Sequence, residues 1–350
     1  MNNKEKKEYL QLNTLSRSTI YQNTIEEREK YISKLPKALF KYRKFDKYTL
    51  DMIKNEYVYL SPAINLDDPF DCLSANNDFE NVYRNKNNHL ILNTQVLEYI
   101  SNIVLRYPHK NKIKKSDILS LIKRSIVDGK ICTDYLKKEL NKINYLTIKQ
   151  KHLLLNIMLH IQSSISKIFD SKCLEELFSF YMNSKEKVGV CSLTTKRDNK
   201  PMWSLYANAY KGYCIEFELP SFEEMTYDIL PVIYAKRFNN GIINAITQFV
   251  IGGIVCKISN GKVANGVESF YELICTKDSD WSYQNEWRIL GDANSKISSL
   301  KIKRIYLGFM VSKRNEQLIL KCSSTKNFEV YKMNKPKNGM KITYTKLTYK

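Results

Sequence analysis

The sequence predicts an α+β protein in which a mixed or antiparallel sheet forms the core and a helical insertion interrupts it. Two observations support this prediction. Short apolar runs bounded by Pro, Gly and polar residues, the pattern of strands, occur both before residue 85 and after residue 185. Between these positions, apolar residues recur at the spacing of helices. We therefore divide the chain into four segments. These are an N-terminal helical arm (residues 1–36), a first part of the core (37–84), a helical insertion or cap (85–185) and a second part of the core (186–350).

The arm is polar and charged, and its helix is expected over residues 18–33. The first part of the core is predicted to begin with a strand over Leu39–Phe45 and a short helix over Asp46–Lys54. A second strand follows over Tyr57–Ser61, and then an acidic loop over Asn65–Asp71. Asp46 is a favourable N-cap residue for the helix. Pro62 ends the second strand.

The insertion carries no chemically suggestive cluster, and its helices are expected over residues 96–104, 118–126 and 153–168. In the second part of the core, strands are expected over residues 188–193, 212–218, 229–234, 287–290, 304–309 and 328–333. Further helices are predicted over residues 201–208, 241–257 and 265–276. Gly212 is interpreted as the residue that permits a tight turn from helix to strand.

The chain is strongly basic, with 56 Lys and Arg against 36 Asp and Glu and a formal charge of +20. A charge of this size favours partners that carry phosphate, such as DNA, RNA, nucleotides or an anionic membrane. Lys, Asn, Ile and Tyr are all abundant, so the charge is also consistent with the background composition of an AT-rich genome. Both interpretations stay open from the sequence.

The eight cysteines are scattered singly, and no Cys or His pattern has the spacing of a zinc site. A reduced, cytoplasmic chain with buried thiols accounts for them. The sequence contains no run of signal-peptide type and none that approaches a membrane span, so no membrane partner is expected. Hydrophobic content of 43% and aromatic content of 12% favour a globular protein over a disordered one. The sequence does not indicate an oligomeric state.

The most informative segment is Trp281–Arg288, in which two tryptophans flank a single glutamate. If the whole segment is a strand, Glu286 and Arg288 share one face while Trp281 and Trp287 share the other. Such a strand could direct the Glu286 carboxylate into an aromatic-walled cleft, where it could contact a ligand that is part sugar and part flat ring. The alternative is a sheet edge whose tryptophans pack the core while Glu286 and Arg288 are solvated.

Four motifs, taken in order, resemble an uncharacterised bacterial family, the Domain of Unknown Function 2971 family. They are Lys41–Arg43, the loop Leu66–Asp71, the block Met202–Phe217, and Trp281–Arg288. Two residues depart from the family pattern. Asp67 stands where the family usually has Asn, and Leu205 stands where His is common. The family name assigns no activity.

The motif order also resembles, more weakly, the layout of ADP-ribosyltransferases of the toxin type. That resemblance implies a split sheet with a basic residue on a first strand, a Ser, Thr or Tyr on a second, and a glutamate on a late strand. Arg43, Tyr59 or Ser61, and Glu286 match these positions. It implies NAD as the substrate, with Glu286 stabilising the positive charge that develops on ribose when the bond to nicotinamide breaks. It also implies a toxin or phage-defence role by analogy alone.

The contacts to NAD that we expect come from Tyr42, Arg43, Tyr59, Ser61, Asp68, Trp203 and Tyr206. Arg43 would hold pyrophosphate or ribose through its guanidinium, and aromatic faces would flank nicotinamide. Several of these residues could instead have a purely structural role. Arg43 could pair with Asp68 or Glu286, Asp68 could serve only a turn, and Trp203 and Tyr206 have the spacing of a helix that packs the core.

Two other classes of function stay open. The carboxylates of Asp67, Asp68, Asp71 and Glu286 could bind a divalent metal in a nuclease. A non-catalytic module could instead bind nucleic acid through the basic cluster Lys301–Arg304. The sequence contains no Gly-rich phosphate loop, which disfavours Rossmann dehydrogenases and P-loop NTPases, and no Ser elbow or Cys–His pairing stands out.

Overall fold

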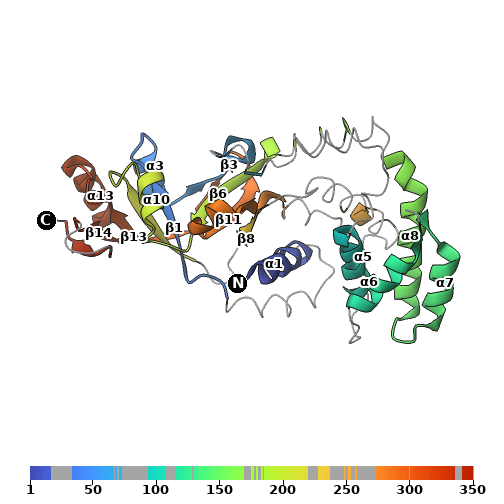
Figure 1. The fold of residues 1–350 in the computed structure, drawn as a ribbon. Coiled ribbons are helices and arrows are strands. Elements are labelled where there is room, and N and C mark those ends of the chain that lie inside the picture. The colour runs from blue at the N-terminus through green and yellow to red at the C-terminus, as the bar shows by residue number, and fades with distance from the viewer. Residues whose placement is uncertain are drawn as a thin grey trace.

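A computed structural model gives the three-dimensional arrangement of the chain (Figure 1). It describes residues 1–16, 34–66, 68, 71–72, 94–106, 115–127, 130–168, 185–219, 228–236, 271, 273–298, 300–335 and 341–349, with a few single positions between 175 and 183 and between 248 and 257. The helix expected over residues 18–33 lies outside these ranges, as do most residues of the helices expected over 241–257 and 265–276.

The core of the protein is a nine-stranded sheet with the order β15-β14-β13-β7-β1-β6-β11-β8, to which β3 is added beside β6. These strands are β1 Ala38–Arg43, β3 Ser61–Pro62, β6 Val188–Thr194, β7 Tyr213–Glu218, β8 Asp228–Pro231, β11 Glu286–Asp292, β13 Lys301–Leu307, β14 Glu329–Met333 and β15 Tyr344–Leu347. The pair β13–β14 is parallel, whereas the other pairs of this sheet are antiparallel. The prediction of an α+β protein with a mixed sheet is confirmed.

The two parts of the core meet where β6 has two partners on one edge. β1 pairs with β6 through Phe40 opposite Thr194, and β3 pairs with the other end of β6 through Ser61 opposite Val190. Between these contacts β1 leaves β6 and pairs along its whole length with β7. The Lys41 ammonium donates to the Ser192 carbonyl across the opening, at 3.0 Å. The sheet is therefore open between β1 and β3.

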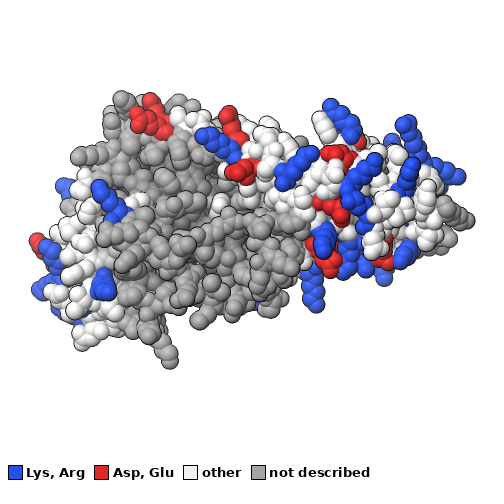
Figure 2. All heavy atoms as spheres, turned by 180° about the vertical axis from the view of Figure 1, so that it is seen from behind, with Lys and Arg blue, Asp and Glu red and all other residues white. Residues whose placement is uncertain are grey.

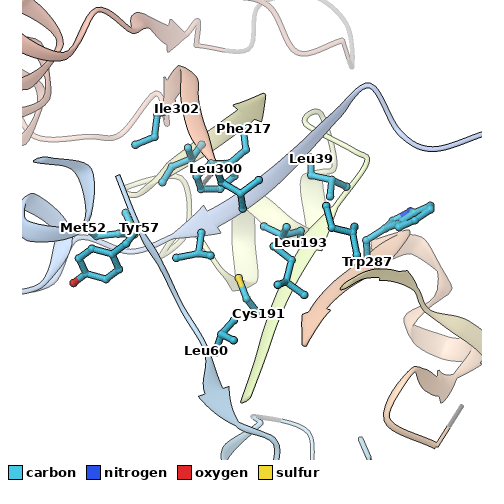
Figure 3. Close-up of a cluster of buried hydrophobic side chains, with 14 of the residues drawn as sticks. Leu39, Met52, Tyr57, Leu60, Cys191, Leu193, Phe217, Trp287, Leu300 and Ile302 are labelled. Atoms are coloured by element: carbon cyan, nitrogen blue, oxygen red, sulfur yellow. The ribbon is translucent and has the colours of Figure 1, made fainter. Parts of the chain in front are cut away.

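Alternation along the central strands divides the apolar residues between the two faces of the sheet. Leu39, Ile215 and Ile305 lie in the large core cluster, which includes the residues drawn in Figure 3. Three helices, α1 Asn3–Ser16, α3 Thr49–Asn55 and α13 Lys313–Lys326, contribute residues to this cluster. The ring of Tyr9 on α1 lies 6.5 Å from that of Trp287. The N-terminal helix that the structure describes therefore packs against the core.

The opposite face of the same strands packs against a smaller cluster around α10, Lys200–Leu205. Tyr42, Cys214, Tyr306 and Met333 are the buried strand residues of this cluster, and Trp203, also buried, belongs to α10. Asn199 caps α10, since its side chain accepts from the Met202 N–H at 3.2 Å. This helix ends at Leu205, earlier than the predicted range.

Residues 94–168 contain a helical region with a hydrophobic core of its own, at the right of Figure 1. Its helices are α5 Thr94–Arg106, α6 Lys115–Arg124, α7 Thr133–Lys142 and α8 Ile148–Ile168, and the short hairpin β4 Ile126–Val127 with β5 Lys130–Ile131 lies between α6 and α7. Among the helices described, none has the length and apolar character needed to cross a membrane. The helical spacing predicted for this block is confirmed over the described residues.

The remaining elements are short. The strand predicted over Tyr57–Ser61 is divided into β2, Val58–Tyr59, which pairs with β12, Lys296–Ile297, and β3. The pair β9, Ile233–Ala235, and β10, Thr276–Asp278, is parallel. β10, β12, β15 and α13 were not predicted from the sequence. On the face shown in Figure 2, Lys and Arg side chains are interspersed with Asp and Glu.

Glycine is required at position 212 because other backbone atoms lie too close for a side chain, and its backbone is not in the left-handed conformation. A Cβ atom there would lie 2.2 Å from the Arg43 carbonyl oxygen and 2.8 Å from that of Ala207. We expect Gly212→Ala to lower the free energy of unfolding by about 1–3 kcal/mol, because backbone atoms would have to move. Denaturant unfolding of this variant is compared with Gly253→Ala, whose added Cβ has no atom within 4 Å. Equal stability of the two variants would contradict the expectation.

Candidate functional site

A cavity of about 810 Å³ lies at the opening between β1 and β3. Its wall is formed by residues of β1, α3, β2, β3, β6, α10, β10 and the start of β11. Of the residues predicted for the site, those that line it are Tyr42, Arg43, Tyr59, Ser61, Asp68, Tyr206 and Glu286. Ligand cavities commonly have volumes of roughly 300–1,000 Å³. Segments far apart in the sequence therefore form one concave site of ligand size.

The position of Glu286 is set by a change of backbone conformation directly before it. The strand predicted over Trp281–Arg288 is wrong in its first half, because residues Ser279–Gln284 form a 3₁₀ helix, η3. Asp278 caps this helix by accepting from the Asp280 N–H at 2.8 Å, and Asn285 ends it in the left-handed conformation with φ of 46°. β11 then begins at Glu286. Trp281 and Trp287 consequently do not share the face of one strand.

The second half of that prediction is confirmed. Glu286 and Arg288 point to the same side of β11, and the Arg288 Nε–H donates to Glu286 Oε1 at 2.8 Å. Both residues are buried, with 3% and 0% of their surfaces exposed. The alternative in which they are solvated at a sheet edge is therefore wrong.

Four buried charges form a closed ring around Glu286, which we call the charge ring. Glu286 pairs with Arg288 at 2.8 Å and with Lys277 at 3.0 Å, and Asp71 pairs with the same two cations at 2.6 Å and 3.0 Å. Two carboxylates thus alternate with two cations, and the formal charge of the ring is zero. Arg288 also donates to the Cys72 sulfur and to the Ile274 carbonyl. A buried ion pair is tolerated only where its remaining polar atoms are bonded in this way.

The ring keeps Glu286 ionised. Burial by itself would raise the pKa of Glu286, but the charges of Arg288 and Lys277 outweigh burial and lower that pKa to about 2. The same attraction from Glu286 and Asp71 overcomes the burial of Lys277 and raises the pKa of its ammonium. At neutral pH the cavity wall therefore presents a fixed carboxylate, which can accept hydrogen bonds and stabilise positive charge but cannot act as an acid.

Arg43 lies on the same cavity wall, beyond the end of the β1–β6 contact. It donates to Asp46 at 3.1 Å, so its ion pair is with this residue instead of the Asp68 or Glu286 expected for a structural role. About a quarter of its side chain is exposed, at 24%. The guanidinium also donates to the Met52 sulfur at 3.5 Å, and its remaining N–H groups can still bind an anionic group of a ligand.

The predicted aromatic residues divide between core and cavity. Trp203 is fully buried and donates to the Arg197 carbonyl at 3.0 Å, and Tyr42 packs edge-on against it with a centroid distance of 5.2 Å. The Tyr42 hydroxyl donates to the Lys196 carbonyl at 2.9 Å, so both rings pack in the core, although Tyr42, unlike Trp203, is also part of the cavity wall. Tyr206, by contrast, lines the cavity beside Glu286, and its hydroxyl accepts from Gln284 at 2.9 Å.

The strands also fix how far apart the site residues lie. Glu286 is opposite Thr194, and Ser61 is opposite Val190, four positions away along β6. At about 3.3 Å per residue, Ser61 lies roughly 13 Å from the level of Glu286. Arg43 is three positions from Phe40, which is level with Thr194, and thus lies roughly 10 Å along in the same direction. Ser61 and Tyr59 therefore do not meet Glu286, and Arg43 lies between the two ends.

The acidic residues do not form an evident metal site. Within the described parts of the chain, no group of three His, Cys, Asp or Glu side chains could hold a metal ion. Asp71 and Glu286 bind the cations of the charge ring. Asp68 lines the cavity, whereas Asp67 lies outside the described residues.

Comparison with known protein families bears on the motifs that form this site. Residues 202–289 match the family described as Protein of unknown function (DUF2971). Over these residues the chain is similar to that family. The matched segment begins in α10 and ends one residue after Arg288. It therefore contains Tyr206 of the cavity wall and three members of the charge ring, Lys277, Glu286 and Arg288. No curated protein and no solved structure matches the chain.

Two members of the charge ring were not recognised from the sequence as part of the site. Lys277 lies on the three-residue strand β10, which has no apolar pattern, and Arg288 was considered only as a solvated residue. The sequence around Arg288 could have indicated that it is buried. The apolar residues Ile289 and Leu290 that follow it predict a central strand, and an arginine buried on such a strand needs a charged or polar partner.

Proposed function

We propose that the cavity binds NAD and that Glu286 promotes cleavage of the bond between nicotinamide and ribose, in a reaction of the ADP-ribosyltransferase type. The observation that carries the proposal is that Arg43 and Glu286 line one cavity of about 810 Å³, with Glu286 held ionised by the charge ring. The proposal includes an ADP-ribosyltransferase-like fold, which is supported by the opening of the sheet between β1 and β3.

In the proposed reaction the glycosidic C–N bond breaks and its electron pair leaves with nicotinamide, which departs as a neutral molecule. Positive charge develops on the ribose, where a carboxylate that accepts a hydrogen bond from a ribose hydroxyl would stabilise it. Glu286 has the required charge, and Arg288 and Lys277 fix its orientation. Water or an acceptor hydroxyl or amine then adds to the ribose carbon and loses a proton.

Two further residues have roles in this proposal. Arg43 lies between the ends of the cavity and would bind the pyrophosphate through its remaining N–H groups. Tyr206, beside Gln284 and near Lys277, would contact the nicotinamide ring in place of the buried Trp203. Tyr42 and Trp203 would then support the cavity wall from the core.

The acceptor in this proposal is nucleic acid, which the formal charge of +20 favours, or alternatively water. A role as a toxin or phage-defence effector would follow from modification of nucleic acid or from depletion of NAD. The nuclease hypothesis has less support, since Asp71 and Glu286 are bonded to cations. Binding of nucleic acid without catalysis remains the third hypothesis, and it requires no cavity.

The test is release of nicotinamide from NAD by the purified protein, with and without DNA and RNA. Glu286→Gln is expected to lower the rate by about 100-fold or more, because removal of a preorganised electrostatic group typically has that effect. Glu329→Gln is the matched control, since charge pairing lowers the pKa of Glu329 to about 2 as well, yet this residue is not part of the cavity wall. The rate for this control should be close to that of the wild type.

The assay is made at a temperature at which circular dichroism shows all three proteins to be folded. No release of nicotinamide by the folded wild type under any of these conditions would overturn the proposal. Cleavage of nucleic acid that depends on magnesium would then favour the nuclease, and salt-dependent binding without cleavage would favour the binding module.

A further inference from the structure

The cavity has a second end that the proposed chemistry does not use. Leu60 marks the position of this end. The Leu60 N–H donates to the Ser295 carbonyl, and the Leu60 carbonyl accepts from the Asn294 N–H. Asn294 and Ser295 both follow the last residue of β11. The Leu60 side chain lies 2.8 Å from the position that a Cβ on Gly291 would occupy. Gly291 is five residues after Glu286 on β11, so this end lies roughly 16 Å along the strand from the carboxylate.

Two exposed tyrosines of the cavity wall come from β2 and from the residue directly before α3. Tyr59, next to Leu60, is 38% exposed, and its hydroxyl donates to Asn294 at 2.5 Å. Tyr48, at the N-terminus of α3, is 57% exposed. Both line the cavity. The hydrogen bond of Tyr59 fixes its ring while leaving part of it accessible, which is a favourable condition for stacking with a planar ligand.

A polar pair joins the helix that follows Tyr48 to the strand that pairs with Tyr59. Asp51 is one helical turn after Tyr48 on α3, and it accepts from the Tyr57 hydroxyl at 2.7 Å and from Lys296 at 3.4 Å. Lys296 lies 4.0 Å above the Tyr57 ring and is opposite Tyr59 in the β2–β12 pair. Figure 3 shows the Tyr57 hydroxyl directed away from the core cluster. The second end thus combines exposed aromatic faces with an acceptor and a cation.

We infer that this end is a subsite for a nucleobase, in which Tyr48 and Tyr59 stack against the base and the Asp51–Lys296 pair contacts its polar edge. Aromatic rings stack against any nucleobase, and an exposed carboxylate accepts from an exocyclic amine. The inference rests on the proposed function and deepens it. With Glu286 at one end, Arg43 roughly 10 Å along and Tyr59 roughly 16 Å along, the order of groups matches ribose, pyrophosphate and base. The substrate class is therefore a dinucleotide, and a mononucleotide would leave the second end empty.

The inference is tested by comparing NAD with nicotinamide mononucleotide, which contains the scissile bond but lacks the second base. We expect Tyr59→Ala and Tyr48→Ala each to raise KM for NAD about tenfold, the effect of losing one stacking contact, with kcat unchanged and with KM for the mononucleotide unchanged. Tyr59→Phe keeps the ring but loses the hydrogen bond that fixes it, and should raise KM for NAD less than Tyr59→Ala does. Tyr145→Ala removes a tyrosine of similar exposure, 43%, from the helical region and should have no effect.

Binding of AMP, measured by calorimetry without turnover, separates failure of this inference from failure of the proposed function. If the wild type does not cleave NAD but binds AMP, and Tyr59→Ala weakens that binding about tenfold, the subsite stands and the proposed reaction fails. If NAD is cleaved but neither alanine variant changes KM for NAD or the affinity for AMP, the subsite is overturned and the reaction stands. Equal changes in KM for both substrates, or no binding of AMP by the folded wild type, would also overturn it.

Discussion

Arg288→Met is expected to lower the free energy of unfolding by about 3–5 kcal/mol, the effect of removing one partner from a buried ion pair. The variant leaves Asp71 and Glu286 in the interior with Lys277 as their shared cation, so the charge ring acquires a net negative charge. Methionine nearly fills the volume of the lost side chain, which limits the contribution of a cavity. Denaturant unfolding at neutral pH measures the change. Lys142→Met is the control, since Lys142 pairs with Glu139 but is 61% exposed, and exposed pairs contribute about 0–1 kcal/mol.

A double variant shows whether charge imbalance is the cause. Arg288→Met combined with Glu286→Gln removes one charge of each sign and leaves the Asp71–Lys277 pair at 3.0 Å. We expect it to be more stable than the sum of the two single changes predicts, with an interaction energy of about 1–3 kcal/mol. Strict additivity, or a loss for Arg288→Met no greater than that for Lys142→Met, would show that the ring contributes no mutual stabilisation.

The sequence predicted the local elements of the sheet and the segments that form the cavity. Alternation placed Glu286 and Arg288 on one face of β11, and the apolar runs located β1, β6 and β7. The motifs before and after the helical region proved to line the same cavity, since Arg43 and Glu286 both belong to its wall. Local periodicity is sufficient for these features because each depends on residues that are close in the chain.

The features that were missed depend on turn chemistry or on contacts between distant residues. Trp281–Gln284 alternates like a strand, yet the Asp278 cap and the left-handed Asn285 make it a 3₁₀ helix. The contact between Asp71 and Lys277 joins positions 206 apart in the sequence, and no local pattern indicates which buried charges will pair. For the same reason, the sequence could not show that Trp203 packs against Tyr42 while Tyr206 faces the cavity.

Acid should remove the stabilisation provided by Glu286 over a defined range of pH. The pKa of this carboxyl is lowered from 4.5 to about 2 in the folded protein, despite burial, by Arg288 and Lys277. A lowered pKa in the folded state means that the stabilisation is fully present above pH 4.5 and is lost as the pH falls toward 2. The difference of about 2.5 pKa units corresponds to about 3 kcal/mol. The stability difference between the wild type and Glu286→Gln should therefore shrink by about this amount between pH 7 and pH 2.5.

Glu329→Gln provides a control in the same range of pH. The pKa of Glu329 is also about 2, lowered by hydrogen bonds from Lys346 and Arg304, but its side chain is 36% exposed. Salt screens interactions between exposed charges far more than those between buried ones. Raising the salt from 0.1 M to 1 M should reduce the pH-dependent difference for Glu329→Gln and leave that for Glu286→Gln nearly unchanged. If salt removes both differences equally, the carboxylate of Glu286 is accessible to solvent ions and the charge ring is not the closed, buried arrangement described above.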